Sequence, residues 1–436
     1  MRALTALLLT AAAATAAPEV RPDLGPPPVF RAVDPARAEL GQLLFYDPIL
    51  SGNRNVSCAT CHHPRFGTSD GLSLGLGEGG IGLGPDRKVD ASNPPEQRIP
   101  RNAPALFNLG AEEFSVMFHD GRLEADSDHP DGMRTPLGQE MLSGFDSVLS
   151  AQAMFPVLSG DEMAGHYSEN DVSQSVRLGH LSLSGGAWDK IAARVVAVPE
   201  YRARFDAVLG QDAAVSFTDI SDVLADFIRV EWRADDSAFD RHMRGEAPLG
   251  AAAQQGMDLF YGKAGCGSCH AGWFQTDHGF HAIAMPQIGP GKAARFETHA
   301  RDEGRMRVTG AAEDAYRFRT PSLRNITDTG PYGHAGSYAT LEAVVRHHLD
   351  PVAGLMEYDP AQAVLVALDG VDDQRILRDQ AELAAIAEAN KLAPVDLSDD
   401  EVAAILSFLA ALSDDGWRQG RMGVPDAVPS GLPVDR

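Results

Sequence analysis

The four cysteines are the feature that most limits what this chain can fold into, because all of them fall in two copies of one short pattern. The first copy, CATCH, consists of Cys58, Cys61 and His62, and the second, CGSCH, contains Cys266, Cys269 and His270. In a C-x-x-C-H pattern the two thiols bond covalently to a haem and the following imidazole binds its iron. The sequence therefore predicts two haem c groups, with the histidine of each copy as an axial ligand.

Three other cysteine sites compete with haem attachment. Two disulfides would suit an exported protein, but the histidine directly after each pair favours haem. A zinc site would need both pairs close in sequence, and they lie much further apart than the roughly 15–20 residues of zinc modules. A thioredoxin-like redox pair would need a βαβ setting, which neither region indicates. Haem attachment is thus the favoured interpretation.

The first residues have the pattern of a cleavable secretory signal. Arg2 precedes an apolar run from Leu4 to Ala14, and small residues follow at 15–17. This order predicts a signal peptide over residues 1–17 and a location in the periplasm, with an uncleaved anchor as the alternative. No later stretch approaches the roughly 18 apolar residues that a membrane span needs, so we expect no further span.

The charge balance argues against nucleic acid as a partner. The chain has 37 basic and 61 acidic residues, with a formal net charge of −24. Phosphate neutralisation requires basic patches, whereas a negative surface favours solubility and steers cationic partners toward the protein. The acidity is equally compatible with a surface that is only solvated.

An internal repeat indicates two related domains. The pattern G-x-x-L-F-Y precedes the first motif at 41–46 and the second at 256–261. Strand-like alternation is scarce, and 436 residues suffice for two or three domains. We therefore expect a mainly α fold with few short strands, built from two cytochrome c-like haem domains in tandem. The expected ranges are 28–182 for the N-terminal domain and 183–436 for the C-terminal domain.

Helix start signals support this fold class. Asp34 followed by Pro35 predicts a helix start ahead of the first repeat. Ser398 with Glu401 predicts a capping box that opens a helix with an apolar stripe. Residues 199–240 are expected to be mostly amphipathic helix and to bridge the two domains.

Five segments occur in a specific order along the chain. They are LFYDPILSGNRNVSCATCH, PRNAPALFNLG, FHDGR, the run 152–163 and FRTPSLRNITDTGPYGHAGSYATLEAVVRHH. As a set they resemble the bacterial di-haem cytochrome c peroxidases and their MauG-type relatives. The resemblance implies that the first haem reacts with hydrogen peroxide and that the second relays electrons to it. The implied donor is a small redox protein, a c-type cytochrome or a cupredoxin, and a homodimer is compatible with the family.

In this resemblance the run 152–163 corresponds to the distal pocket of the reactive haem. Gln152, Pro156 and Glu162 match members whose iron is open, with the proline over the vacant position. Glu162 is then the expected acid and base in peroxide cleavage, and Gln152 orients the oxidant, since a carboxyl of raised pKa can move a proton there. Other members place a releasable histidine in the glycine-rich loop. The matching residue here is Glu78, which we expect to be a solvated charge.

The stretch TLEAVVRHH is expected to supply the far ligand of the second haem. Leu341, Val344, Val345 and His348 follow at helical spacing and so share one apolar face. His348 therefore points inward, and the family has its sixth ligand, a methionine or tyrosine, at this position. We expect His348 to bind the second iron, with His347 as the alternative. Two imidazoles would give a lower potential than a His/Met pair.

Two further expectations come from the resemblance. Asn102, Thr329 and Pro331 match the residues through which the family binds calcium between its haems, and oxygen ligands suit that ion. His119, in FHDGR, stands where the family has a tryptophan between the haems. Imidazole is much harder to oxidise than indole, so a relay in which this residue holds the hole is in doubt. His119 either bridges the haems by hydrogen bonds or is structural.

Two other functions are compatible with the sequence. The spacing of Gln152, Pro156 and Glu162 also suits a MauG-like oxidase that modifies a partner protein, although His119 argues against it. A non-enzymatic electron carrier would instead have both irons six-coordinate.

Overall fold

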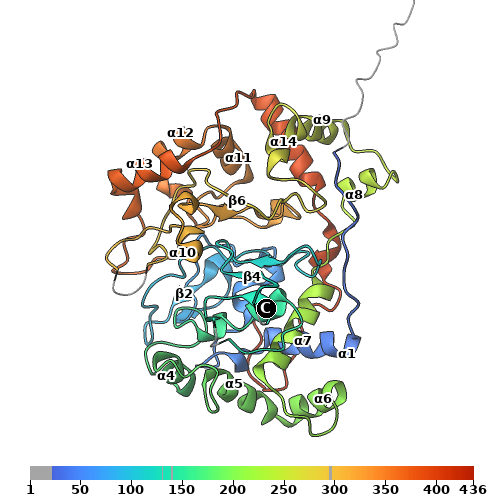
Figure 1. Ribbon diagram of the computed structural model, residues 1–436, viewed down its shortest axis with the longest axis vertical. Coiled ribbons are helices and arrows are strands. Elements are labelled where there is room, and N and C mark those ends of the chain that lie inside the picture. The colour runs from blue at the N-terminus through green and yellow to red at the C-terminus, as the bar shows by residue number, and fades with distance from the viewer. Residues whose placement is uncertain (1–21, 130, 139–140, 294–296) are drawn as a thin grey trace, which may run out of the picture.

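The computed structural model describes residues 22–129, 131–138, 141–293 and 297–436 (Figure 1). Helices hold 38% of the residues and strands 6%, which confirms the expected, mainly helical fold class. Within the described ranges, no helix combines the length and the apolar character that a bilayer crossing requires. The expected signal peptide, residues 1–17, lies outside the described residues.

Helices and short strands alternate along the chain. The helices up to the middle of the chain are α1 (Pro35–Tyr46), α2 (Cys58–Cys61), α3 (Val148–Gln152), α4 (Asp171–Arg177), α5 (Ala187–Val196), α6 (Pro199–Leu209), α7 (Phe217–Glu231) and α8 (Ala238–Met243). Those that follow are α9 (Ala251–Tyr261), α10 (Met306–Thr309), α11 (Leu341–Leu349), α12 (Pro351–Met356), α13 (Gln380–Ala389) and α14 (Asp399–Ala411). The strands are β1 (Gly80–Ile81), β2 (Lys88–Val89), β3 (Val116–Met117), β4 (Leu123–Ala125), β5 (Met133–Arg134), β6 (Phe280–His281) and β7 (Phe318–Arg319). They pair antiparallel as β1-β2, β3-β4-β5 and β6-β7, so the sheets are small.

Capping residues begin the helices where the sequence indicates. The Asp34 carboxylate accepts a backbone hydrogen bond in the first turn of α1. Ser398 and Glu401 form a reciprocal capping box at the start of α14. The stretch 199–240 is divided among α6, α7 and the start of α8. Gly210 ends α6 with a φ of 104°, a conformation outside the helical region that glycine adopts readily.

The repeated G-x-x-L-F-Y pattern marks one helix crossing in each half of the molecule. Gly41 lies where α1 meets α7, and a Cβ there would lie 2.6 Å from the carbonyl carbon of Val223. Gly256 lies where α9 meets α14, and a Cβ there would lie 2.5 Å from the carbonyl carbon of Ala404. A side chain of any size would hold these helices apart, so glycine is what allows both crossings.

An apolar core surrounds each crossing. The first core joins α1 with α5, α6 and α7 in the lower half of Figure 1, coloured blue to green. The second joins α9 and α14 in the upper half, with Phe239 and Leu323. The first core runs on through α5, α6 and α7 to Ala234, and so contains side chains from both sides of residue 182. The division between residues 182 and 183 therefore stays a prediction.

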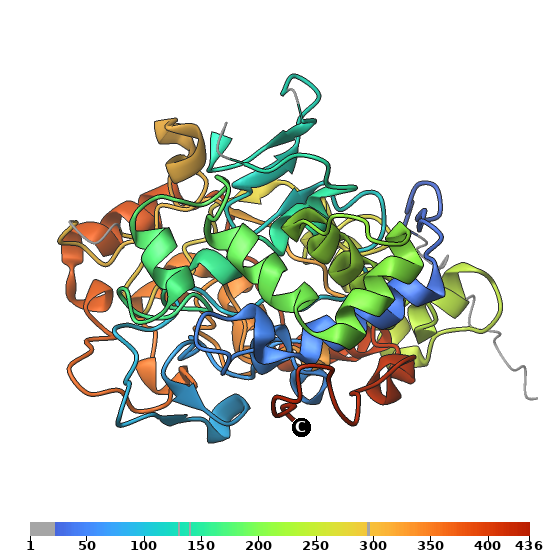
Figure 2. The same cartoon turned by 90° about the horizontal axis from the view of Figure 1, so that it is seen from below.

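The segment after α14 returns to the first half of the molecule (Figures 1 and 2). Trp417 and Val428 are buried in the first core. The hydroxyl of Thr60, inside the CATCH motif, donates to the Asp435 carboxylate at 2.5 Å. Residues 417–436 thus form part of the structure around the first motif.

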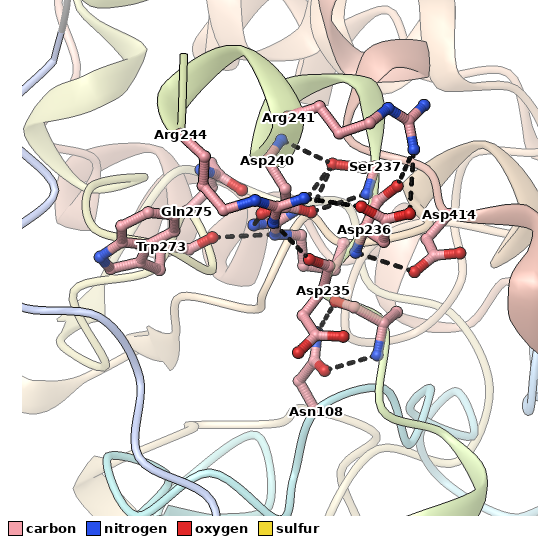
Figure 3. Close-up of polar contacts among 12 residues, drawn as sticks. Asn108, Asp235, Asp236, Ser237, Asp240, Arg241, Arg244, Trp273, Gln275 and Asp414 are labelled. Carbon is pink, nitrogen blue, oxygen red and sulfur yellow. Dashed lines mark hydrogen bonds and ion pairs between the residues drawn. The ribbon is translucent and has the colours of Figure 1, made fainter. Parts of the chain in front are cut away.

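Polar contacts at the start of α8 join the two halves (Figure 3). The Asn108 side chain donates to the carbonyl of Ala234 and accepts from its N–H, both at 2.8 Å. Arg324 forms a buried ion pair with Asp240 at 2.8 Å and donates to Ser237 Oγ at 3.0 Å. These contacts hold the segment that leads from α7 into the second half.

Candidate active site

The first C-x-x-C-H motif is held by a short helix and the turn after it. Cys58 and Cys61 begin and end α2, and Ser57 and Thr60 form its capping box. His62 follows, and its Nδ1 donates to the carbonyl oxygen of Thr68 at 3.0 Å. This hydrogen bond sets the tautomer and leaves Nε2 as the nitrogen that can bind a metal.

The second motif repeats this arrangement. Nδ1 of His270 donates to the carbonyl oxygen of Gln275 at 2.9 Å, which again leaves Nε2 for a metal. Burial lowers the pKa of His62, and it lowers the pKa of His270 to about 4, so both rings are neutral, as metal ligands are. The four cysteines, all described, form no disulfide. Two thiols beside one free imidazole nitrogen at each motif fit haem c.

A possible ligand group for another metal lies beside the second motif. Ligand atoms of Cys269, Asp277 and His281 lie within 4.8 Å of one another. The group draws on one cysteine pair only, and Asp277 already pairs with His281 at 2.8 Å. The zinc alternative, which requires both cysteine pairs, therefore gains no support from this group.

His348 on α11 faces the histidine of the second motif. The ring centroids of His270 and His348 lie 6.4 Å apart, a distance that one metal ion bonded to both rings at about 2 Å would span. Nδ1 of His348 donates to the carbonyl of Val344 at 2.7 Å, so its Nε2 is also free. His347 is used elsewhere, because its Nε2 donates to the carbonyl of Ile283 at 2.8 Å. The geometry favours His348 over His347 as the sixth ligand.

The run expected to form the distal pocket lies near the first motif. Gln152 ends α3, Pro156 opens a short 3-10 helix, and all three expected pocket residues are half-buried. Burial raises the pKa of the Cys61 thiol to about 12, and the charge of Glu162 adds to this rise, which places Glu162 within electrostatic range. Burial also raises the pKa of Glu162, against the opposing charges of Lys292 and Arg122. Such a carboxyl is suited to hold and release a proton.

The expectation that Glu78 is a solvated charge is wrong. Its side chain is 0% exposed, and its Oε1 accepts hydrogen bonds from Asn55 at 2.7 Å and Asn53 at 3.1 Å. Its backbone N–H donates to the carbonyl of Asp161 at 2.9 Å. Two amide donors from the chain just before the first motif satisfy Oε1, whereas Oε2 is buried without a hydrogen-bond partner among the described residues. The glycine-rich loop is therefore packed against the Glu162 segment.

His119 lies in the region where the two halves meet. Its backbone carbonyl accepts from the N–H of Arg319 at 2.7 Å, and the ring of Phe118 contacts that of Phe155 edge to face at 5.6 Å. Burial lowers the pKa of His119 well below its usual value, and the charge of Arg101 acts in the same direction. The imidazole is therefore neutral and can both donate and accept one hydrogen bond.

A buried ion-pair network sits beside His119. Arg101 pairs with Asp120, which follows His119, at 2.7 Å and with Asp302 of the second half at 2.6 Å. Burial opposes ionisation of Asp302, but Arg101 outweighs it and holds the pKa of that carboxyl well below its usual range. Because all three side chains are buried, the network ties the two halves together by charge.

Two of the three residues expected to bind calcium make hydrogen bonds through their side chains. The Asn102 amide donates to the carbonyl of Leu72 at 2.8 Å, and the Thr329 hydroxyl donates to the carbonyl of Ile326 at 3.3 Å. Pro331 follows in the loop after Thr329. Calcium at these residues stays a prediction.

Comparison with known proteins identifies the family. A family model described as di-haem cytochrome c peroxidase matches residues 35–248. Methylamine utilization protein MauG of Methylorubrum extorquens is 33% identical over 334 residues, which cover 76% of this chain and 73% of that protein. The chain belongs to the di-haem cytochrome c peroxidase family. It is therefore an oxidoreductase of the di-haem peroxidase type, and family membership implies two haem c groups.

Other members of the di-haem peroxidase family show the same likeness. Cytochrome c peroxidase Ccp of Escherichia coli is 30% identical over 363 residues, 81% of this chain and 63% of that protein. The crystal structure of a MauG-like protein associated with microbial copper homeostasis superposes with a TM-score of 0.60 at 25% identity, over 92% of this chain and 97% of that one. The diheme peroxidase BthA of Burkholderia thailandensis shares the fold, with a TM-score of 0.57, 21% identity and coverage of 94% and 92%.

The two attachment motifs of this di-haem peroxidase differ in their exposure. Ala59 and Thr60, inside the first motif, are buried, whereas Ser268, inside the second, is exposed. The second motif thus lies nearer to solvent than the first.

Sequence reasoning missed several residues of this site. Lys292 and Arg122 flank Glu162 electrostatically, and Arg101 joins the halves. Arg122 is the last residue of the FHDGR segment, so this segment could have indicated a role for it. Lys292 comes from a glycine-containing loop of the second half, and nothing in its local sequence indicates the contact.

Proposed function

We propose that this chain reduces hydrogen peroxide to water in the periplasm, with electrons delivered one at a time by a small c-type cytochrome or cupredoxin. The observation that carries the proposal is the difference between the two sites. His348 faces His270 at the second motif, whereas a carboxyl of raised pKa, Glu162, lies near the first. One site is thus suited to relay electrons and the other to proton chemistry.

The overall reaction consumes one peroxide, two electrons and two protons and yields two water molecules. When bound, the haem groups supply the electrons and a position for the oxidant. Glu162 takes the proton from the inner oxygen of peroxide and returns it to the outer oxygen, which leaves as water. Gln152 holds the oxidant by hydrogen bonding, Pro156 keeps the adjacent space apolar, and Thr68 keeps His62 oriented through Nδ1.

The charges around Glu162 suit this proton transfer. Burial favours the neutral carboxyl, and Lys292 and Arg122 favour the carboxylate. With opposing influences of this kind, both protonation states are accessible, as an acid and base catalyst requires. The same cations lie where they can attract the anionic form of the oxidant.

The donor is proposed to dock near the second motif. That motif lies nearer to solvent than the first, and the formal net charge of −24 favours a cationic partner. Turnover with a basic donor should therefore fall steeply as ionic strength rises, since exposed charges are screened.

The Glu162→Gln variant tests the proposal. Purified protein is mixed with hydrogen peroxide and a reduced small cytochrome, and donor oxidation is followed by absorbance. We expect a loss of about 10²-fold or more, because the proton carrier is removed while the volume is kept. The exposed Glu313→Gln variant is the control and should turn over as the parent does. Equal rates for the two variants would refute the role of Glu162.

Spin state provides an independent test. We expect a high-spin ferric signal from the first haem and a low-spin signal from the second in electron paramagnetic resonance of the resting protein. Turnover should begin without prior reduction, because no histidine has to leave the first iron. Two low-spin signals would instead favour the electron carrier.

A second candidate function is oxidation of a partner protein, which the resemblance to the MauG-type relatives implies; one such relative is 33% identical to this chain. The spacing of Gln152, Pro156 and Glu162 suits it, and His119 in place of tryptophan argues against long-range hole transfer. Mass spectrometry of partner proteins after incubation with this chain and peroxide would detect added oxygen or new crosslinks.

Calcium binding through Asn102, Thr329 and Pro331 is also proposed from the family likeness. Metal analysis after dialysis against a chelator and then calcium should recover one ion per chain. Asn102→Ala should abolish that recovery, and retention of the ion would refute the assignment.

A further inference from the structure

The two attachment motifs carry a hydroxyl at the same position, in very different surroundings. Thr60 in CATCH and Ser268 in CGSCH both stand directly before the second cysteine. Thr60 is 3% exposed, and its hydroxyl donates to the Asp435 carboxylate at 2.5 Å. Ser268 is exposed, and its hydroxyl donates to the carbonyl of Gly265, in its own turn, at 2.8 Å. A distant part of the chain thus lies over the first motif at the point where the second motif faces solvent.

The segment 431–436 runs beside the first motif. The side chains of Leu432 and Val434 pack against the first core, as does the first cysteine of the motif. Burial lowers the pKa of His63, which directly follows the motif, and the charge of Asp435 acts in the opposite direction. The Asp435 carboxylate therefore lies beside both the motif and the residue after it.

Contacts earlier in the chain hold this segment in place. The Glu231 carboxylate, at the end of α7, accepts hydrogen bonds from the backbone N–H groups of residues 421–423 at 2.7–3.0 Å. The hydroxyl of Ser430 donates to the buried Asp47 carboxylate at 2.7 Å. All of these anchors come before residue 431, so they do not depend on the segment that follows them.

Covalent attachment fixes which part of the haem lies at this motif. Thioether bonds to Cys58 and Cys61 hold the vinyl-bearing edge of the macrocycle there. Chain that lies over the motif therefore lengthens the path from solvent to this edge. The rate of electron tunnelling falls exponentially with distance, so an added layer of chain slows direct electron transfer from outside.

We propose that residues 431–436 insulate the first haem, so that an outside reductant delivers its electrons to the second haem. The segment thereby determines which haem accepts electrons, since it excludes a competing reaction of the cofactor. The proposal rests on haem attachment at both motifs and on the relay role that the proposed function gives to the second haem. It does not depend on peroxide cleavage.

A variant that stops after Ser430 tests the proposal. None of the six residues that it lacks is buried, and the buried Trp417 and Val428 remain. The deletion removes Asp435 and Arg436, one acid and one base, so the balance of charged side chains does not change. The control is Asp415→Ala, which removes a carboxylate that is 87% exposed and lies before the insulating segment.

Anaerobic stopped-flow mixing with reduced methyl viologen, a small one-electron reductant, measures where electrons enter. The low-spin and high-spin haems are followed at separate wavelengths over a range of reductant concentrations. In the parent and in Asp415→Ala, the reduction rate of the high-spin haem should reach a plateau as the concentration rises, because its electrons pass through the second haem.

In the truncated variant the reduction rate of the high-spin haem should instead keep rising in proportion to reductant concentration. Loss of one layer of chain brings the reductant nearer by about 4 Å, the packing distance of carbon atoms, so the bimolecular rate constant of this haem should rise about tenfold or more. A plateau in the truncated variant would overturn the proposal, and so would a proportional rise in the parent.

Pyridine haemochrome measures whether the truncated variant retains both haems. If it does not, Asp435→Ala replaces it, because this change breaks the contact with Thr60 at full length. A proportional rise above the Asp415→Ala control would then support the proposal, and a rate equal to that of the control would overturn it. The experiment contains no peroxide, so its failure is distinguishable from a failure of the Glu162→Gln test of peroxidase function.

Discussion

The glycine of the second repeat provides a sharp test of how the two helices of the second core meet. In Gly256→Ala the new Cβ would lie 2.5 Å from the carbonyl carbon of Ala404 and 2.9 Å from the Cβ of Phe408. Carbon atoms pack at about 3.5–4.0 Å, so α9 and α14 would have to separate by about 1 Å. The obstructing atoms of Ala404 belong to the backbone of α14, so they cannot move aside by a change of side-chain rotamer.

The expected loss is the difference between two effects. Alanine in a helix interior is favoured over glycine by about 1 kcal/mol. Overpacking a core typically costs about 1–3 kcal/mol, and a gap of about 1 Å forfeits up to half of each dispersion contact along the crossing. Because Phe260, Ile405 and Phe408 all lose contacts when the helices separate, we expect a cost near the top of this range and a net loss of about 2 kcal/mol.

Guanidinium unfolding of the holoprotein, followed by circular dichroism, measures this loss. The second haem gives a local signal, because His270 follows α9 and a shift of that helix would alter its low-spin spectrum. Gly250→Ala is the control: it lies at the N-cap of the same helix, no atom lies within 4 Å of its added Cβ, and we expect a change below about 1 kcal/mol. If both variants lose the same stability, the close crossing does not depend on Gly256.

Three further predictions concern other parts of the structure. His348→Met should raise the potential of the second haem, because a thioether replaces an imidazole, and an unchanged potential in spectroelectrochemistry would point away from His348 as ligand. Arg324→Ala should cost about 3–5 kcal/mol in denaturant unfolding, because Asp240 is left buried and unpaired, whereas Arg418→Ala, at a half-exposed ion pair, should cost less than about 1 kcal/mol. Burial raises the pKa of Asp70 from 3.8 to about 6, so its contribution to stability is complete below pH 3.8 and is lost as pH rises through about 6. The Asp70→Asn variant should therefore gain stability relative to the parent as pH rises from 3.8 to about 6. If the difference between the denaturation midpoints of variant and parent does not change with pH, the expectation is contradicted.

Local patterns predicted the parts of this protein that depend on sequence neighbours. The C-x-x-C-H motifs place thiols and imidazole together by covalent connection alone. The spacing of Val344 and His348 on one helix predicted an inward histidine, and His348 does face His270. The repeated glycines, Gly41 and Gly256, also have equivalent positions in the structure.

Other parts could not be predicted because their partners are distant in sequence. Glu78 looked like a solvated charge, since nothing near it in the loop indicates Asn53 and Asn55 as donors. Arg87 lies in a stretch of glycine and proline that reads as a loop, although its side chain is buried. The approach of Lys292 to Glu162 depends on how the two halves meet, which local periodicity does not encode.

The return of residues 417–436 to the first half bears on the order in which the chain can mature. Domains commonly fold in turn as they leave the ribosome or a membrane channel, N-terminal first. Here Trp417 and Val428 belong to the first core, and Asp435 receives the hydrogen bond of Thr60 within the first attachment motif. The first half therefore completes its core only when residues 417–436 are in place, and until then its attachment motif lacks part of its cover.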